Sequence, residues 1–204
     1  MSTASERHDI EHFNRWSRTY EDSLLQRFFF DRVHRAVLKL VANRTDPGRI
    51  LDVGCGTGRL LRAARARWPR AELIGVDPAN GMVEVARQLT PAATFYVGMA
   101  EALPLPDASV DVALSTISFH HWKDQAAGVR EVARALRPEG YFFLTDVSVP
   151  AWLSRFIHQP RVHSPAHLRT LFMEAGLNVL IQQAVFSRFV LASIGVCSRE
   201  TDDR

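Results

Sequence analysis

One short stretch, Ile50 to Leu60, constrains this chain more than any other, and it reads ILDVGCGTGRL. The apolar residues at its start suit a buried parallel strand, its glycines suit a tight turn, and a helical pattern begins at Arg59. Glycine lets a backbone turn sharply and lie close to a ligand, and a following helix offers free N–H groups and a positive dipole end. A strand, a glycine turn and a helix in this order predict a binding loop for a small cofactor.

The spacing of the glycines separates this loop from a dinucleotide-binding fingerprint. Gly54, Gly56 and Gly58 alternate, whereas the fingerprint G-x-G-x-x-G places its last glycine three positions after the second. A carboxylate, Asp52, lies on the strand just before the loop and favours a positively charged ligand. At these residues the chain resembles the class I S-adenosylmethionine-dependent methyltransferases, in which this loop holds the methionine part of the cofactor. The same spacing disfavours a nicotinamide-dependent oxidoreductase.

A second carboxylate, Asp77, ends the next predicted strand, 19 residues after Gly58 (77 minus 58). From this position a carboxylate can accept hydrogen bonds from both hydroxyls of a cofactor ribose. An alternative is that Asp77 serves only the start of the helix predicted from Asn80 to Leu89. The loop, the spacing and the strand end together favour the ribose. The resemblance adds four further residues at the cofactor: Cys55, Pro78, Met82 and Ser115.

The resemblance continues from Gly98 to Pro104. Methyltransferases of the ubiquinone and menaquinone biosynthesis type carry Gly-Asp-Ala-Glu-x-Leu-Pro here, and the aspartate and the alanine backbone hold the adenine ring. This chain has Met99 in place of the aspartate. A thioether accepts hydrogen bonds only weakly, although it can lie against the ring. We therefore expect backbone contacts at Ala100, a substitute carboxylate in Glu101, and weaker discrimination between nucleobases.

The predicted strand Val110 to Ser115 leads into the segment TISFHHW. Open parallel sheets bind ligands beyond the carboxyl ends of their strands, so this segment should face the transferred methyl group. His120 and His121 are therefore candidates for a general base near neutral pH, and Trp122 could pack against a sulfonium. The alternative is that one histidine caps the next helix and Trp122 belongs to the core.

The overall pattern predicts one compact α/β unit with an N-terminal helical cap. Strands and helices alternate through the chain, and two strands, Val179 to Phe186 and Phe189 to Cys197, follow the last helix. This predicts a doubly wound, Rossmann-like sheet of seven strands, in which the resemblance implies an antiparallel hairpin at one edge. We assign residues 1–45 to the cap and 46–204 to the methyltransferase domain. Tyr20 of the cap is a candidate lid over the cofactor.

Composition narrows the partners. The balance of 25 basic and 22 acidic residues gives a net charge of +3, which is too slight to identify a nucleic-acid binder. Arginines that cluster between positions 59 and 70 leave an RNA methyltransferase open, although a solvated helix face explains them more simply. Two cysteines, no signal sequence and no long apolar stretch lead us to expect a cytoplasmic protein without a membrane span. A metal site from His158, His163 and His167 is conceivable, but no cysteine or carboxylate accompanies them at ligand spacing, so we expect no metal.

The resemblance implies methyl transfer from S-adenosylmethionine to an O, N, C or S atom of a small-molecule acceptor, which leaves S-adenosylhomocysteine. A hypothesis from another class is a regulatory module that binds the cofactor without catalysis. Met99 favours that module, whereas Asp52, Asp77 and the glycine loop favour the enzyme. The sequence leaves open which molecule is methylated and how many copies of the chain assemble.

Overall fold

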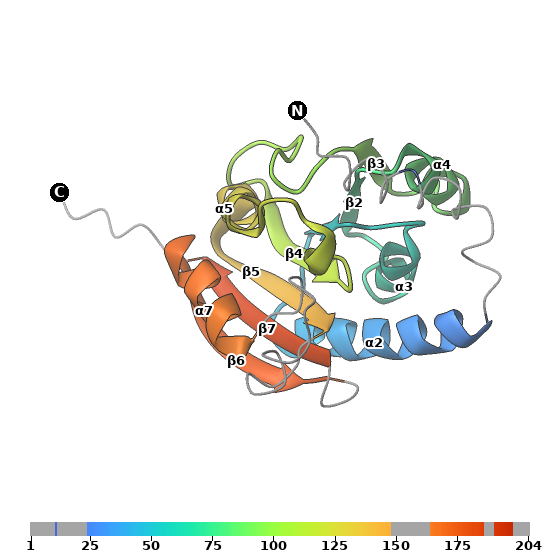
Figure 1. The fold of residues 1–204 in the computed structure, drawn as a ribbon. Coiled ribbons are helices and arrows are strands. Elements are labelled where there is room, and N and C mark those ends of the chain that lie inside the picture. The colour runs from blue at the N-terminus through green and yellow to red at the C-terminus, as the bar shows by residue number, and fades with distance from the viewer. Residues whose placement is uncertain (1–10, 12–23, 148–163, 186–189, 198–204) are drawn as a thin grey trace.

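The structure is a computed structural model, and it describes residue 11 and residues 24–147, 164–185 and 190–197. Helices and strands alternate along the described chain, and the strands form a single twisted sheet between two layers of helices (Figure 1). The elements are, in order, α2 Leu24–Ala42, β1 Arg49–Val53, α3 Arg59–Arg67, β2 Glu72–Asp77, α4 Asn80–Leu89, β3 Thr94–Val97, β4 Val110–Thr116, the 3-10 helix η1 Phe119–His121, α5 Gln125–Ala135, β5 Leu136–Val147, α7 Pro165–Glu174, β6 Leu177–Ala184 and β7 Val190–Cys197.

The sheet has seven strands in the order β3-β2-β1-β4-β5-β7-β6. Strands β1 to β5 pair in parallel, and β7 runs antiparallel to both β5 and β6. The predicted seven-stranded sheet with an antiparallel edge hairpin is therefore confirmed. The chain builds outward from β1 through β2 to β3 and then returns to place β4 on the other side of β1. This reversal opens a crevice beyond the carboxyl ends of β1 and β4, where open α/β sheets bind their ligands.

Each face of the sheet carries its own apolar cluster. Helices α2, α3 and α4 cover one face, where Val37, Leu61 and Val83 pack against strand residues. Helices α5 and α7 cover the other face, where Val132 and Phe172 do the same (Figure 1). The central strands are apolar along most of their length because side chains on both faces are buried.

The largest difference from the predicted elements lies at the start of β5. The sequence predicts a strand from Tyr141, but the structure begins it at Leu136, which pairs with Val110 before the register shifts. Glu139 adopts a positive φ of 66° in this irregular part. The segment contains a proline and a glycine, which are typical of a turn, so the sequence does not predict this short pairing.

Two expectations concern other parts of the chain. The predicted lid residue Tyr20 lies outside the described residues. Among the helices that the structure describes, none is both long enough and apolar enough to cross a membrane.

Candidate functional site

A cavity lies beyond the carboxyl ends of β1, β2 and β4, at the crevice that the strand order creates. Its walls come from α2, from the glycine loop, from the end of β2 with the start of α4, from the loop after β3, and from the segment after β4. The residues that line it include Phe30, His34, Asp52, Gly54, Cys55, Gly56, Thr57, Arg59, Asp77, Pro78, Met82, Gly98, Met99, Ala100, Glu101, Thr116, Ile117, Ser118, His121, Trp122 and Lys123.

The glycine loop turns away from β1 through left-handed backbone conformations. Gly54 has a φ of 75°, and its N–H donates to the carbonyl oxygen of Val76 on β2 at 2.8 Å. A Cβ atom on Gly54 would lie 2.4 Å from the Ser118 hydroxyl, so no larger residue fits there without displacing the loop. Gly56 also has a positive φ, of 52°, but a Cβ on it would meet no atom within 4 Å. The loop therefore brings backbone close to an open space at Gly56.

Asp77 connects the end of β2 to the glycine loop. Its Oδ2 accepts the N–H of Gly56 and its Oδ1 accepts the N–H of Ala79, both at 2.9 Å. Burial raises the pKa of Asp77 to about 6, although these two N–H groups oppose the shift. An ionised carboxylate offers about four lone-pair positions, so about two remain for a ligand. The side chain can thus brace the loop and bind two ligand hydroxyls at once.

Asp52 lies 2 % exposed at the end of β1, and no described residue donates a hydrogen bond to its carboxylate. Burial raises the pKa of Asp52 to about 8, and the negative charge of Asp77 adds to the shift. A buried charge without a partner is costly, so a positively charged ligand group would stabilise the ionised form. The carboxylate therefore fits the cationic end of a ligand.

Cys55 and Met82 form an apolar part of the wall. Both are buried, and burial raises the pKa of the Cys55 thiol well above its usual value. A thiol of this kind is a poor nucleophile because the thiolate is the reactive form. These residues therefore supply packing surface at the cavity.

The loop after β3 forms the opposite wall. The N–H of Gly98 donates to the carbonyl oxygen of Asp77 at 3.1 Å, and Met99 and Ala100 follow along the cavity. Glu101 also lines the cavity, but its Oε1 accepts the N–H of Asp124 at the start of α5 at 2.8 Å. Its carboxylate therefore already ties the loop to α5, which limits its use as a substitute for the missing aspartate.

The two histidines have different surroundings. Asp146 is 3 % exposed at the end of β5, and its carboxylate accepts the backbone N–H of His120 at 3.0 Å and faces the His120 Nδ1 at 2.8 Å. The ring of His121 lies with its centroid 4.1 Å from that of His120. His121 lines the cavity, whereas His120 does not. Asp146 thus holds His120 in place, and His121, whose ring packs against that of His120, is the histidine at the cavity.

The structure brings most of the predicted site residues together around this one cavity. Gly58, Ser115 and His120 are not among the lining residues. Gly58 caps α3, and the Ser115 hydroxyl lies 2.9 Å from the hydroxyl of Ser118, which does line the cavity. Tyr20 lies outside the described residues, so its role as a lid stays a prediction.

Sequence reasoning did not select Phe30 and His34, which reach the cavity from α2. They are four residues apart and so lie on one side of the helix, next to the stripe of Val33, Val37 and Val41 that enters the core. The sequence signal that could have identified them is a histidine and an aromatic residue next to the apolar stripe of the helix. Their position makes α2 part of the wall of the site.

Comparison with known proteins agrees with this geometry. A family model described as "Methyltransferase domain" matches residues 51–144, from β1 to β5. The uncharacterized methyltransferase YcgJ of Bacillus subtilis is 39 % identical over 153 residues, which cover 71 % of this chain and 57 % of that protein. The malonyl-[acyl-carrier protein] O-methyltransferase of Dechloromonas aromatica is 32 % identical over 177 residues, which cover 81 % of this chain and 63 % of that protein. The chain thus spans about three fifths of the length of these relatives.

Solved structures share the fold. A methyltransferase in complex with the Haloferax volcanii Trm112 methyltransferase activator superposes with a TM-score of 0.76 at 23 % identity, covering 91 % of this chain and 97 % of that one. The crystal structure of YcgJ from Bacillus subtilis gives a TM-score of 0.68 at 24 % identity, covering 81 % and 99 %. Residues 51–144 thus match a methyltransferase domain, and the relatives and the sheet order agree with the class I, S-adenosylmethionine-dependent type.

Proposed function

We propose that the cavity binds S-adenosylmethionine and that the chain transfers its methyl group to a small-molecule acceptor. The observation that best supports this is the pairing of Asp52 and Asp77 around one glycine loop. The buried carboxylate of Asp52, to which no residue in the described part of the chain donates a hydrogen bond, fits the cationic methionine end, and the spare lone pairs of Asp77 fit the ribose hydroxyls. The open space at Gly56 lets the ligand approach the backbone.

The cofactor supplies a methyl group already activated on a sulfonium, so the chain has chiefly to align it with the acceptor. Alignment of two reacting groups can contribute about 7–11 kcal/mol of the barrier reduction. The acceptor would approach from the side of α2 and of the segment after β4, where Phe30, Ile117 and His121 line the cavity. These residues offer apolar and aromatic surface with one ionisable group.

His121 is the candidate to receive a proton from the acceptor. It lines the cavity, and its neighbour His120 is locked by two contacts with the buried Asp146. With Nδ1–H donating to the carboxylate, His120 keeps one tautomer and one ring orientation and so fixes the face against which His121 packs. A general base is needed only when the acceptor is protonated at the working pH.

One relative is a malonyl-[acyl-carrier protein] O-methyltransferase, so a malonyl thioester is a second candidate acceptor for this chain. The cationic side chains of Arg59 and Lys123 line the cavity and favour an acidic molecule. A carboxylate acceptor is already deprotonated at neutral pH and would need no base. The role of His121 therefore separates the two acceptor classes.

Transfer of a labelled methyl group tests the function. The purified chain is expected to transfer label from S-adenosylmethionine to a member of a panel that contains phenols, amines, thiols and malonyl-acyl carrier protein. For an acceptor that gives up a proton, His121→Asn should lower kcat by about 10²–10⁴-fold, whereas malonyl methylation should change little. His167→Asn, on the far helix α7, is the control. Cofactor binding without transfer to any member would favour the regulatory module instead.

Two glycine substitutions are expected to separate folding from binding. Gly54→Ala adds a methyl group 2.4 Å from the Ser118 hydroxyl at a positive φ, and should cost about 2–5 kcal/mol of stability. Gly56→Ala meets no neighbour and should cost only about 1–2 kcal/mol, but its methyl group narrows the cavity. Chemical denaturation and calorimetric titration with S-adenosylhomocysteine measure the two effects. Gly56→Ala should therefore lose more affinity than Gly54→Ala for the same loss of stability. If the two variants lose affinity in the same proportion to stability, Gly56 does not lie close to the ligand.

A further inference from the structure

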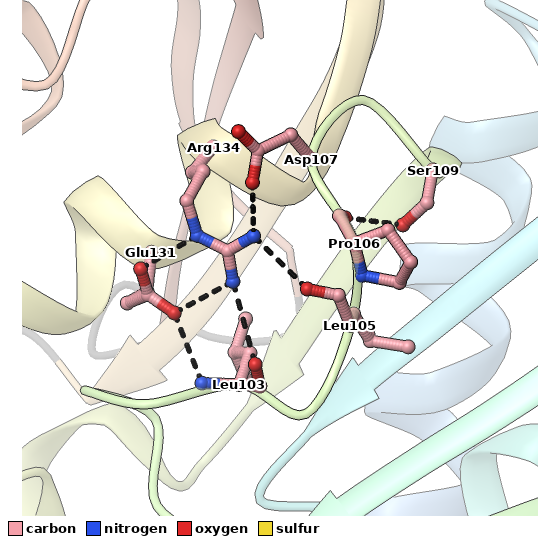
Figure 2. A network of polar contacts seen from close by, with 7 residues as sticks. All are labelled: Leu103, Leu105, Pro106, Asp107, Ser109, Glu131 and Arg134. Carbon is pink, nitrogen blue, oxygen red and sulfur yellow. Dashed lines mark hydrogen bonds and ion pairs between the residues drawn. The ribbon is translucent and has the colours of Figure 1, made fainter.

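Arg134 and Glu131 of helix α5 both bind the loop from residue 98 to residue 109, between β3 and β4 (Figure 2). Its first part, at Met99 and Ala100, forms a wall of the cavity. Its second part contains Pro104 and Pro106, which have no N–H to donate, so the loop cannot form a regular backbone ladder. Some of its carbonyl groups, such as that of Leu105, accept donors from outside the loop.

Arg134 of α5 supplies these donors. Its Nη1 donates to the carbonyl oxygen of Leu105 at 2.9 Å and to Asp107 Oδ1 at 2.6 Å, and its Nη2 donates to the carbonyl oxygen of Leu103 at 3.3 Å. Leu103 and Leu105 are 5 % and 8 % exposed and belong to the apolar cluster on this face of the sheet. The guanidinium thus fixes the loop backbone where two buried leucine side chains anchor it.

Glu131, one turn earlier on α5, fixes the guanidinium in turn. Its Oε1 accepts Arg134 Nε at 2.7 Å and its Oε2 accepts Arg134 Nη2 at 2.8 Å (Figure 2). The same Oε2 accepts the N–H of Leu103 at 3.0 Å. The hydrogen bonds with Arg134 lower the pKa of Glu131, so the pair is ionised at neutral pH. A bidentate pair of this kind has a defined geometry, so the backbone groups of the loop that bind to it are also fixed in position.

A second attachment lies at the cavity end of the loop. Glu101 accepts the N–H of Asp124, and Asp124 Oδ1 accepts the N–H of Ala127 as the N-cap of α5. Helix α5 thus holds the loop at both ends of the stretch from Glu101 to Asp107. These attachments on one side, and the hydrogen bond from Gly98 to Asp77 on the other, hold the backbone at Met99 and Ala100.

We infer that Arg134, together with Glu131, is a positioning residue for the adenosine end of the cofactor, an inference that rests on the proposed function. Met99 cannot make a strong hydrogen bond to the adenine, so recognition at this wall depends on backbone groups. Backbone groups recognise a ligand only when the loop is held at a fixed distance from it. Arg134 acts through the loop and does not touch the ligand space, since it is not among the residues that line the cavity.

Calorimetric binding tests this inference. Arg134→Ala is expected to weaken S-adenosylhomocysteine about tenfold, and to weaken 5′-methylthioadenosine, which lacks the amino-acid end, by the same factor. The titrations are run at a temperature at which the variant is fully folded, because loss of global stability alone does not change the affinity of the folded protein. Arg137→Ala is the matched control, since Arg137 also forms an ion pair, but with Asp111 of β4 at 2.6 Å and not with a residue of the loop. It should leave both affinities unchanged.

A second measurement reports on the conformation of the loop in the ligand-free protein. The chain has four methionines, of which Met82 on α4 and Met99 in the loop both line the cavity. In methyl NMR spectra, Arg134→Ala and the milder Glu131→Gln should shift or broaden the Met99 signal and leave the Met82 signal in place. If the wild-type chain binds S-adenosylhomocysteine, an unchanged Met99 signal or unchanged affinities in the Arg134→Ala variant would overturn the inference. A wild-type chain that does not bind S-adenosylhomocysteine would overturn the proposed function, while the Met99 signal still reports on the loop.

Discussion

S-adenosylhomocysteine is expected to raise the melting temperature of this chain, and Asp77→Ala is expected to abolish that rise. A ligand stabilises the folded state by RT ln(1 + [L]/Kd), which is about 2.7 kcal/mol at a hundredfold excess over Kd and about 5–10 °C for a chain of this size. Two hydrogen bonds from ribose hydroxyls to an ionised carboxylate contribute about 1.5–3 kcal/mol each. Their loss lowers the affinity by two orders of magnitude or more, so almost no shift remains at the same concentration.

Asp77 also braces the glycine loop through Gly56 and Ala79, so loss of binding has to be separated from loss of structure. Asp111 provides a matched control at the opposite end of the sheet. Its Oδ2 accepts the N–H groups of Gly48 and Arg49, at 2.9 and 2.7 Å, just as Asp77 accepts two backbone donors. Asp111→Ala should lower the melting temperature of the free protein but keep the ligand-induced rise. A normal rise in the Asp77→Ala protein would remove the ribose assignment.

The fold could be predicted from sequence because its signals are local. Strand and helix boundaries follow from apolar runs, periodicity and breakers, and β2, α4 and β3 end at the predicted residues. The glycine spacing and the two strand-end carboxylates likewise lie in short segments, and Asp52 and Asp77 both line the cavity. Their roles in binding stay predictions until a ligand is measured.

What sequence could not predict depends on contacts between distant segments. His120 and Asp146 are 26 residues apart, and only the parallel pairing of β4 and β5 brings the end of one strand next to the segment that follows the other. Arg134 likewise lies 29 residues from Leu105, whose carbonyl oxygen it binds. A pattern that is read along the chain contains no information about such pairs, because the partner of a buried polar group is set by topology.

The second large effect is a pH dependence that we expect from Asp52. Its pKa rises from the ordinary aspartate value of 3.8 to about 8 in the folded chain, chiefly by burial, so between about pH 4 and pH 8 the folded state binds a proton that the unfolded state has released. The free energy of unfolding of the free protein should therefore fall as the pH rises through this interval. The slope from one group is at most about 1.4 kcal/mol per pH unit, or about 3–5 °C. Asp77, with a folded pKa of about 6, adds to the slope only below that pH.

The ligand should reverse this trend. A cationic ammonium group at Asp52 favours the ionised carboxylate, so the affinity for S-adenosylhomocysteine should increase from pH 6 to pH 8 while the free protein becomes less stable. Asp52→Asn keeps the shape without the charge, and it should flatten both dependences and weaken binding most at pH 8. Melting curves at pH 6, 7 and 8, with and without ligand, measure both effects. A carbon NMR titration in which the Asp52 carboxyl group of the free protein ionises near pH 4 would contradict this expectation. Asp52 would then already be ionised in the free protein at pH 6, and neither stability nor affinity would depend on its titration between pH 6 and pH 8.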